Sequence, residues 1–251
     1  KKVLSNPPFC GSVAGRGFCD RHNLREETME ILPVGIYGAY PAPGCASACY
    51  LVRGSDATVV LDMGSGSLSA LRKYIEPKDV DAFVLSHLHY DHFCDALPLA
   101  YYPGRHVIYC PATPSECFTL LKKSPSHDVR VINEGAHIKV GSMTFDFMRT
   151  VHPVETYAVR VSEGGRSFVY TADTQWTDRL IDFCRGSELV LTDCSFPAGT
   201  PHMTAEEGAR LGRESGTRVI AIHFSPVYDA SPSLSALGIP EAEAGRTIKA
   251  W

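Results

Sequence analysis

The stretch Ser86-His87-Leu88-His89-Tyr90-Asp91-His92 places three imidazoles and one carboxylate within six positions. It directly follows Ala82-Phe83-Val84-Leu85, and a short apolar run of this kind predicts a buried strand. Polar residues at a strand end lie in a loop held by a rigid scaffold, where functional residues concentrate. Imidazole and carboxylate together suit zinc, iron or manganese, and this run offers more ligands than one ion needs. The run therefore predicts a dinuclear metal site, with its remaining ligands elsewhere in the chain.

The composition is that of an ordinary globular protein with one large domain. The chain has 251 residues, of which 44% are hydrophobic and 21% charged, typical of the globular class. No apolar run approaches the ~18 residues that a membrane span needs, so no membrane partner is expected. Nine cysteines, an odd number, favour reduced thiols and a cytoplasmic location. The net charge of −4 disfavours nucleic acid relative to a small-molecule substrate. The possibility of a homo-oligomer stays open.

Strand-like and helical patterns alternate along most of the chain. Residues 1–28 lack sustained periodicity and are interpreted as an N-terminal extension, with the main domain at 29–251. Strands are predicted at 30–37, 47–52, 58–61, 82–85, 105–110, 129–132, 137–140, 143–148, 156–161, 167–171, 189–191, 219–222 and 247–251. Helices are predicted at 71–75, 95–101, 114–123, 176–184 and 204–214. The pattern predicts an α/β (α+β) fold in which two mixed sheets pack face to face with helices outside.

Three later residues of metal-ligand type also follow strand-like runs. His152 comes shortly after the run 143–148, Asp173 after 168–172, and His223 directly after 219–222. A single histidine at a strand end is more often a satisfied polar residue than a ligand. Several such strand ends together with the dense histidine run favour one shared site at the edge of the sheets.

These motifs resemble the metallo-β-lactamase superfamily. The run from His87 to His92 matches its His-x-His-x-Asp-His signature, and Asp62, after Val59-Val60-Leu61 and before Gly64, resembles its first motif. His152, Asp173 and His223 stand in the order of its later metal-binding motifs. The resemblance covers roughly residue 29 to the C-terminus, and it implies a four-layer αββα sandwich.

The resemblance also implies a ligand set for two divalent ions, with zinc favoured and manganese, iron or nickel as alternatives. The ligands implied for one ion are His87, His89 and His152, and those for the other are Asp91, His92 and His223. Asp173 would bridge the ions together with a water or hydroxide, and Asp91 also counts among the catalytic residues. Asp62 would orient a ligand through hydrogen bonds, as metal ligands require.

A second cluster narrows the branch of the family. Thr204 with Glu207 three residues later forms a capping-box pattern, which would place His202 just before a helix. The segment resembles the His-x-Thr element of the ribonuclease Z-like and phosphodiesterase branch. There a histidine pairs with an acidic residue and stabilises the leaving group, so His202 would take that role with Asp193 as its partner. The family more often has glutamate at the position of Asp193.

The function predicted is a dinuclear metal-dependent hydrolase, favoured as a phosphodiesterase that cleaves a small nucleotide or cyclic phosphate with a metal-bridging hydroxide. The alternatives are hydrolysis of a thioester, ester or lactam on the same fold, and tRNA 3′-end processing. No Gly- and Pro-rich insertion resembles the flexible arm of tRNA-processing members. Four histidines match no pattern and are predicted to be surface or loop residues: His22, His106, His127 and His137.

Overall fold

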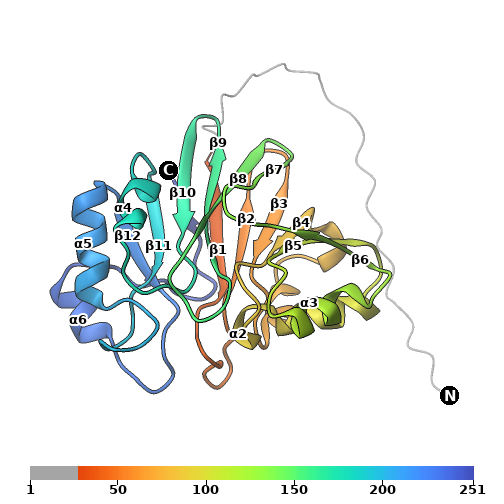
Figure 1. Cartoon of the computed structure of the whole chain (residues 1–251), viewed down its shortest axis with the longest axis horizontal. Helices are drawn as coiled ribbons and strands as arrows, with labels where there is room; N and C mark the ends of the chain where they lie inside the picture. The colour runs from red at the N-terminus through yellow and green to blue at the C-terminus, as the bar shows by residue number, and fades with distance from the viewer. Residues whose placement is uncertain (1–27) are drawn as a thin grey trace, which may run out of the picture.

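Two mixed β-sheets form the centre of the molecule (Figure 1). The computed structural model describes residues 28–251. The seven-stranded sheet has the order β13(Ile248–Lys249), β1(Glu30–Gly35), β2(Cys49–Arg53), β3(Thr58–Leu61), β4(Ala82–Val84), β5(His106–Cys110) and β6(His127–Val131). The six-stranded sheet has the order β12(Arg218–Ile222), β11(Leu189–Asp193), β10(Arg166–Tyr170), β9(Tyr157–Glu163), β8(Met143–Arg149) and β7(His137–Val140).

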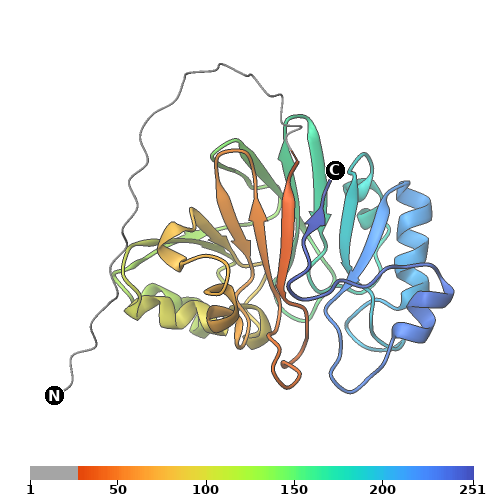
Figure 2. The ribbon, with the colours of Figure 1, turned by 180° about the vertical axis from the view of Figure 1, so that it is seen from behind.

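Helices cover the outer face of each sheet. Those on the seven-stranded sheet are α1(Ser67–Leu71), α2(Tyr90–Phe93) and α3(Ser115–Lys122), with the 3₁₀ helices η1(Pro77–Asp79) and η2(Cys94–Tyr101). Those on the six-stranded sheet are α4(Arg179–Cys184), α5(Ala205–Ser215) and α6(Ser231–Ala236). Figure 2 shows the same layers from behind, with the last strand β13 beside β1. The predicted four-layer αββα sandwich is confirmed.

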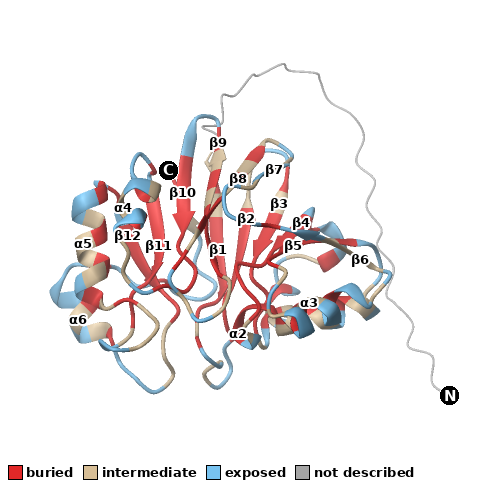
Figure 3. Cartoon of the chain, viewed as in Figure 1, coloured by how far each residue is buried: buried red, intermediate tan, exposed pale blue. Residues whose placement is uncertain are grey.

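Alternation along the strands divides the core into three parts. On β2, Tyr50 and Val52 point between the sheets, whereas Cys49 and Leu51 point towards the helices. Successive strand side chains face opposite sides of a sheet, so a strand buried on both sides is apolar at nearly every position. The central strands are accordingly buried, whereas the edge strands β6 and β7 are partly exposed and α3, α5 and α6 expose their outer faces (Figure 3). This double burial explains why the strands were recognisable as short continuous apolar runs.

The elements differ from their predicted positions in a few places. The helix predicted at 71–75 lies one turn earlier, as α1, because the chain enters it through Gly66, whose φ of 81° is left-handed and suits glycine. Helix α6 was not predicted. The expected N-terminal extension, apart from residue 28, lies outside the described residues, as does His22. Within 28–251, no helix combines the length and apolar character needed to span a lipid bilayer.

Candidate metal centre

Three strand ends deliver site residues in a strained backbone conformation. Asp62 follows β3 with φ 59°, His223 follows β12 with φ 58°, and Ala172, directly before Asp173, has φ 52°. Left-handed φ is uncommon for residues other than glycine and costs about 1–3 kcal/mol unless the surroundings hold it. Such residues concentrate at functional sites. All three lie at the same edge of the sandwich as the histidine run.

The first ligand group joins the histidine run to the loop after β8. His87, His89, His152 and Asp173 each offer one nitrogen or oxygen, and these four atoms lie within 4.8 Å of one another. His89 Nδ1 is 3.1 Å from both His87 Nε2 and His152 Nε2. The imidazole nitrogens of two distant segments, the histidine run and the loop after β8, therefore face one point.

The second ligand group shares Asp173 with the first. Asp91, His92, Asp173 and His223 again place their ligand atoms within 4.8 Å of one another. His92 Nε2 is 3.0 Å from His223 Nε2 and 3.2 Å from Asp173 Oδ1, whereas Asp173 Oδ2 is 3.7 Å from His87 Nε2. One oxygen of Asp173 thus faces each group. The structure brings all seven predicted ligands together, with the predicted bridging residue in the middle.

The donor atoms of both groups fit divalent ions. With Zn–N distances of about 2.0–2.1 Å, two ligands of a tetrahedral ion lie ~3.3 Å apart, close to the observed nitrogen separations of 3.0 and 3.1 Å. Asp173 Oδ1 is buried without a hydrogen-bond partner among the described residues, and buried polar atoms normally have one. A cation between these atoms would satisfy that oxygen. Imidazole and carboxylate also match the donor preference of zinc, iron and manganese.

Asp62 orients His92 directly and His87 through Ser86. It is fully buried and accepts hydrogen bonds from Ser86 N at 2.7 Å, Ser86 Oγ at 2.8 Å, His92 Nδ1 at 2.7 Å and Tyr170 OH at 2.5 Å. Ser86 Oγ also lies 3.0 Å from His87 Nδ1. Bonding at Nδ1 fixes each ring and leaves Nε2 for an ion. The sequence suggested Asp62 for this work but gave no sign of Ser86 or Tyr170.

His202 lies beside Asp173, the predicted bridging residue, and is paired with a second acidic residue, Asp193. Its Nδ1 is 2.7 Å from Asp193 Oδ2 and 3.9 Å from Asp173 Oδ2. The capping box of Thr204 and Glu207 is present at the start of α5, so His202 sits two residues before a fixed helix N-cap. The ring of Phe196 stacks on His202, with centroids 4.0 Å apart. Phe196 lies in the segment that was singled out, but its stacking role was not predicted.

Asp193 serves a second histidine as well. Its Oδ1 is 3.6 Å from His223 Nδ1, on the side of the ring that faces away from the ligand group. The side chain is fully buried at the end of β11. A single carboxylate therefore bonds His202 and lies at ion-pair distance from His223. The four residues Asp173, Asp193, His202 and His223 could themselves hold an ion, but Asp193 and the Nδ1 atom of His202 already bond each other.

Two glycines permit the close packing around the site. A Cβ on Gly38 would lie 2.0 Å from His223 Nε2, and one on Gly64 would lie 1.8 Å from the backbone oxygen of Asp91. Any side chain at Gly38 would displace the imidazole, and one at Gly64 would push away α2, which carries Asp91 and His92. Gly64 had been noted only as part of the motif around Asp62, and Gly38 was not predicted to matter, because no pattern in the sequence links residue 38 to residue 223.

The histidines of the site have pKa values that are shifted in opposite directions in the metal-free protein. Burial lowers the pKa of His223, but Asp173, Asp193 and Asp91 outweigh it and raise that pKa to about 10. Burial likewise opposes the carboxylates around His92, whose pKa is raised well above its ordinary value. Burial lowers the pKa of His87 well below its ordinary value, and the neighbouring His92 adds to that effect. Neutral and protonated imidazoles thus coexist, with the pKa of Asp173 held low by His223 and His92 despite its burial.

Metal uptake is expected to release protons. Because their pKa is raised, His92 and His223 bind protons more readily than free imidazoles do when no metal is present, and an imidazole must lose its proton at the nitrogen that binds an ion. Adding Zn²⁺ to metal-free protein in weak buffer should release up to about two protons per chain. Since pH below the raised pKa favours the protonated rings, metal affinity should weaken as pH falls. Calorimetry in buffers of different ionisation enthalpy measures the release; pH-independent affinity with no release would contradict the assignment.

A sequence model of the metallo-β-lactamase superfamily matches residues 42–216. The chain belongs to the metallo-β-lactamase superfamily. It is 31% identical over 221 residues to a probable metallo-hydrolase, YhfI of Bacillus subtilis, covering 82% of this chain and 91% of the relative. The crystal structure of YhfI superposes with a TM-score of 0.83 at 27% identity, over 89% of this chain and all of that one. The predicted metallo-hydrolase is confirmed at this level.

Weaker likenesses point to the predicted branch of the superfamily. Ribonuclease Z of Salinispora arenicola is 24% identical over an alignment of 277 positions, gaps included. The alignment covers 83% of this chain and 88% of the relative. A diphosphatase of the PhnP family shares the fold with a TM-score of 0.73 at 17% identity, over 88% of this chain and 97% of that one. The resemblance to the ribonuclease Z-like branch is therefore confirmed.

One prediction about the remaining histidines was wrong. His106 is not a surface or loop residue: it lies within β5 with 1% of its surface exposed, and its ring packs edge-on against Phe83. His127 is half-buried at the start of β6, whereas His137 is exposed on β7, 2.6 Å from Asp146. A histidine in a strand reads like any polar residue in the sequence, so its burial could not be inferred there.

Proposed function

We propose that this chain is a dinuclear phosphodiesterase that acts on a small nucleotide or cyclic phosphate, with zinc as the favoured metal. The observation that supports it most strongly is the position of His202 beside Asp173, with Asp193 bonded to its Nδ1. When bound, two divalent ions lower the pKa of water to give a nucleophile and neutralise charge on the substrate oxygens. The location proposed for this enzyme is the cytoplasm.

The residues of the chain divide the remaining work. His87, His89 and His152 would hold one ion, and Asp91, His92 and His223 the other, with Asp173 between them. Asp193 keeps the Nδ1 proton of His202 in place, so Nε2 is the nitrogen that can give a proton to the leaving oxygen. Phe196 restricts the rotation of that ring by stacking on it.

A substrate panel tests the proposal. We expect the metal-loaded protein to hydrolyse bis(p-nitrophenyl) phosphate and a nucleoside 3′,5′-cyclic phosphate. Acyl thioesters and β-lactams should be turned over slowly, because a site that stabilises the transition state of phosphoryl transfer does not match that of attack on a planar carbonyl. Robust thioester or lactam hydrolysis with none on phosphodiesters would contradict the proposal.

Precursor tRNA is the third substrate of the panel, because Ribonuclease Z of Salinispora arenicola is related to this chain. The net charge of −4 opposes a phosphate backbone, whose contacts need lysine and arginine. We expect no 3′-end cleavage. Salt-sensitive cleavage of precursor tRNA at a rate above that of cyclic phosphates would replace the small-substrate proposal by the tRNA-processing one.

A further inference from the structure

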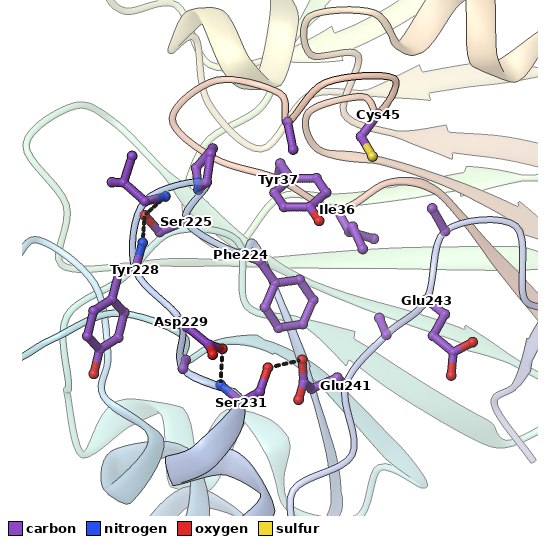
Figure 4. A pocket seen from close by; sticks show the side chains of 16 residues that line it. Ile36, Tyr37, Cys45, Phe224, Ser225, Tyr228, Asp229, Ser231, Glu241 and Glu243 are labelled. Atoms are coloured by element: carbon purple, nitrogen blue, oxygen red, sulfur yellow. Dashed lines mark hydrogen bonds between the residues drawn. The ribbon is translucent and has the colours of Figure 1, made fainter.

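A pocket of about 660 Å³ lies beside the second ligand group, between the loop after β1 and the loop after β12 (Figure 4). Tyr37 and Phe224 form part of its wall, and the backbones of their segments are joined, since Gly38 N donates to the Phe224 carbonyl at 3.1 Å. Phe224 directly follows His223, and Gly38 packs on the His223 imidazole. Tyr37 and Phe224 are thus each the sequence neighbour of a residue at the metal site, Gly38 and His223 respectively.

The pocket is aromatic and acidic. Tyr37, Phe224 and Tyr228 line it together with three carboxylates. None of the described lining residues is a lysine, arginine or histidine. A phosphate would be repelled by such a wall, whereas a flat, uncharged group can stack on the aromatic rings, as bases do in nucleic-acid-binding proteins. The pocket therefore suits the part of a phosphodiester that carries no charge.

Each of the three carboxylates uses one oxygen in a local hydrogen bond, and they differ in where their side chains point. Asp229 Oδ1 accepts from the backbone of Ser231 at 3.0 Å, near the start of α6. Glu243 Oε1 is held by Arg246 at 2.7 Å, and its side chain points away from the aromatic rings in Figure 4. Glu241 Oε2 accepts from Ser231 Oγ at 3.1 Å, and its Oε1 has no partner among the described residues. In Figure 4 Glu241 lies below the Phe224 ring, so its second oxygen is an acceptor beside the aromatic wall.

We propose that this pocket binds the nucleobase of the substrate and that Glu241 accepts a hydrogen bond from an exocyclic amino group of that base. Carboxylates recognise such amino groups in nucleic acids. The volume accommodates a bicyclic base with its ribose, and the phosphate is left at the metal site next to His223. This inference rests on the proposed phosphodiesterase function and narrows it to amino-bearing nucleotides such as those of adenine.

Binding of nucleosides tests the pocket without any turnover. Adenosine and inosine differ at one position, where inosine carries an oxo group in place of the amino group. Calorimetry on the metal-loaded protein should show adenosine binding about tenfold more tightly than inosine. Glu241→Gln should abolish or invert the preference, because an amide can also donate to the oxo group. The matched variant Glu243→Gln should keep it, since that carboxylate is turned towards Arg246.

Turnover separates failure of this inference from failure of the proposed function. The inference predicts that kcat/KM for adenosine 3′,5′-cyclic phosphate exceeds that for the inosine compound about tenfold. It also predicts that Glu241→Gln removes this tenfold difference, whereas Glu243→Gln keeps it. Equal turnover of both cyclic nucleotides and no binding of adenosine would overturn the inference while the phosphodiesterase stands. Adenosine binding that depends on Glu241, without hydrolysis of any phosphodiester, would retain the base site and reject the phosphodiesterase. Tighter binding of glycerophosphocholine than of adenosine would assign the pocket to a quaternary ammonium and overturn the base site.

Discussion

Replacing His202 with alanine is expected to lower kcat for a cyclic nucleotide by about 100-fold or more, the usual contribution of a general acid. The ribose oxygen that leaves such a substrate is a poor leaving group and needs a proton as the bond breaks. His202 lies beside Asp173 and is oriented by Asp193, to which its Nδ1 is bonded, and it is not among the seven ligands predicted for the two ions. The metal content of the variant should therefore stay at the wild-type value.

The leaving group distinguishes proton donation from charge stabilisation. p-Nitrophenolate leaves without help, so a His202 that donates a proton matters much less for bis(p-nitrophenyl) phosphate. Equal losses on both substrates would instead mean that His202 stabilises charge on the phosphate oxygens. His137→Ala is the matched control, because His137 is exposed on β7 and bonded only to Asp146. Full activity of His202→Ala on the cyclic nucleotide would remove His202 from the mechanism.

Replacing Asp173 with asparagine is expected to cause the largest loss, on the order of 10³-fold in kcat. Asp173 is 2% exposed, and its two oxygens face the two ligand groups. An amide keeps the size of the side chain but removes the charge that offsets the two ions and offers only one oxygen. The variant should bind about one ion per chain, or bind both much more weakly.

Measurements of folding and of bound metal show whether the loss of activity in the Asp173→Asn variant comes from a changed metal site. The metal-free Asp173→Asn protein should still fold, which circular dichroism checks, and its metal content is measured after dialysis against limiting Zn²⁺. Asp146→Asn is the matched control: the same change on β8, where Asp146 only contacts His137. A variant that keeps both ions and wild-type turnover would show that Asp173 does not bridge them.

The strands and the site residues at their ends could be predicted from the sequence for a physical reason. Buried strands are apolar on both faces, so the runs Phe83-Val84 and Val219-Ile220 are recognisable as strands in the sequence. The polar residues that follow these strands must lie at a sheet edge. Helix α6 was missed because its sequence, Ser231 to Ala236, has only Leu234 buried and no apolar repeat. Its start is marked by a proline instead, which suits the first turn of a helix.

The contacts between distant segments could not be predicted. His92 and His223 are 131 residues apart, and their 3.0 Å contact depends on how the two sheets pack. The bond from Tyr170 to Asp62 crosses from one sheet to the other. The pocket between Tyr37 and Phe224 likewise exists only once both loops are in place. A single sequence carries local patterns, whereas these contacts arise from the register and packing of whole sheets.

The number of metal ions that activity requires tests the central claim most directly. Protein freed of metal by a chelator is titrated with Zn²⁺ while bound metal and hydrolysis of bis(p-nitrophenyl) phosphate are followed together. The two ligand groups joined by Asp173 predict that binding saturates at about two ions per chain and that activity reaches its maximum only as the second ion binds. Saturation at one ion with full activity, or full activity without metal, would contradict the dinuclear site.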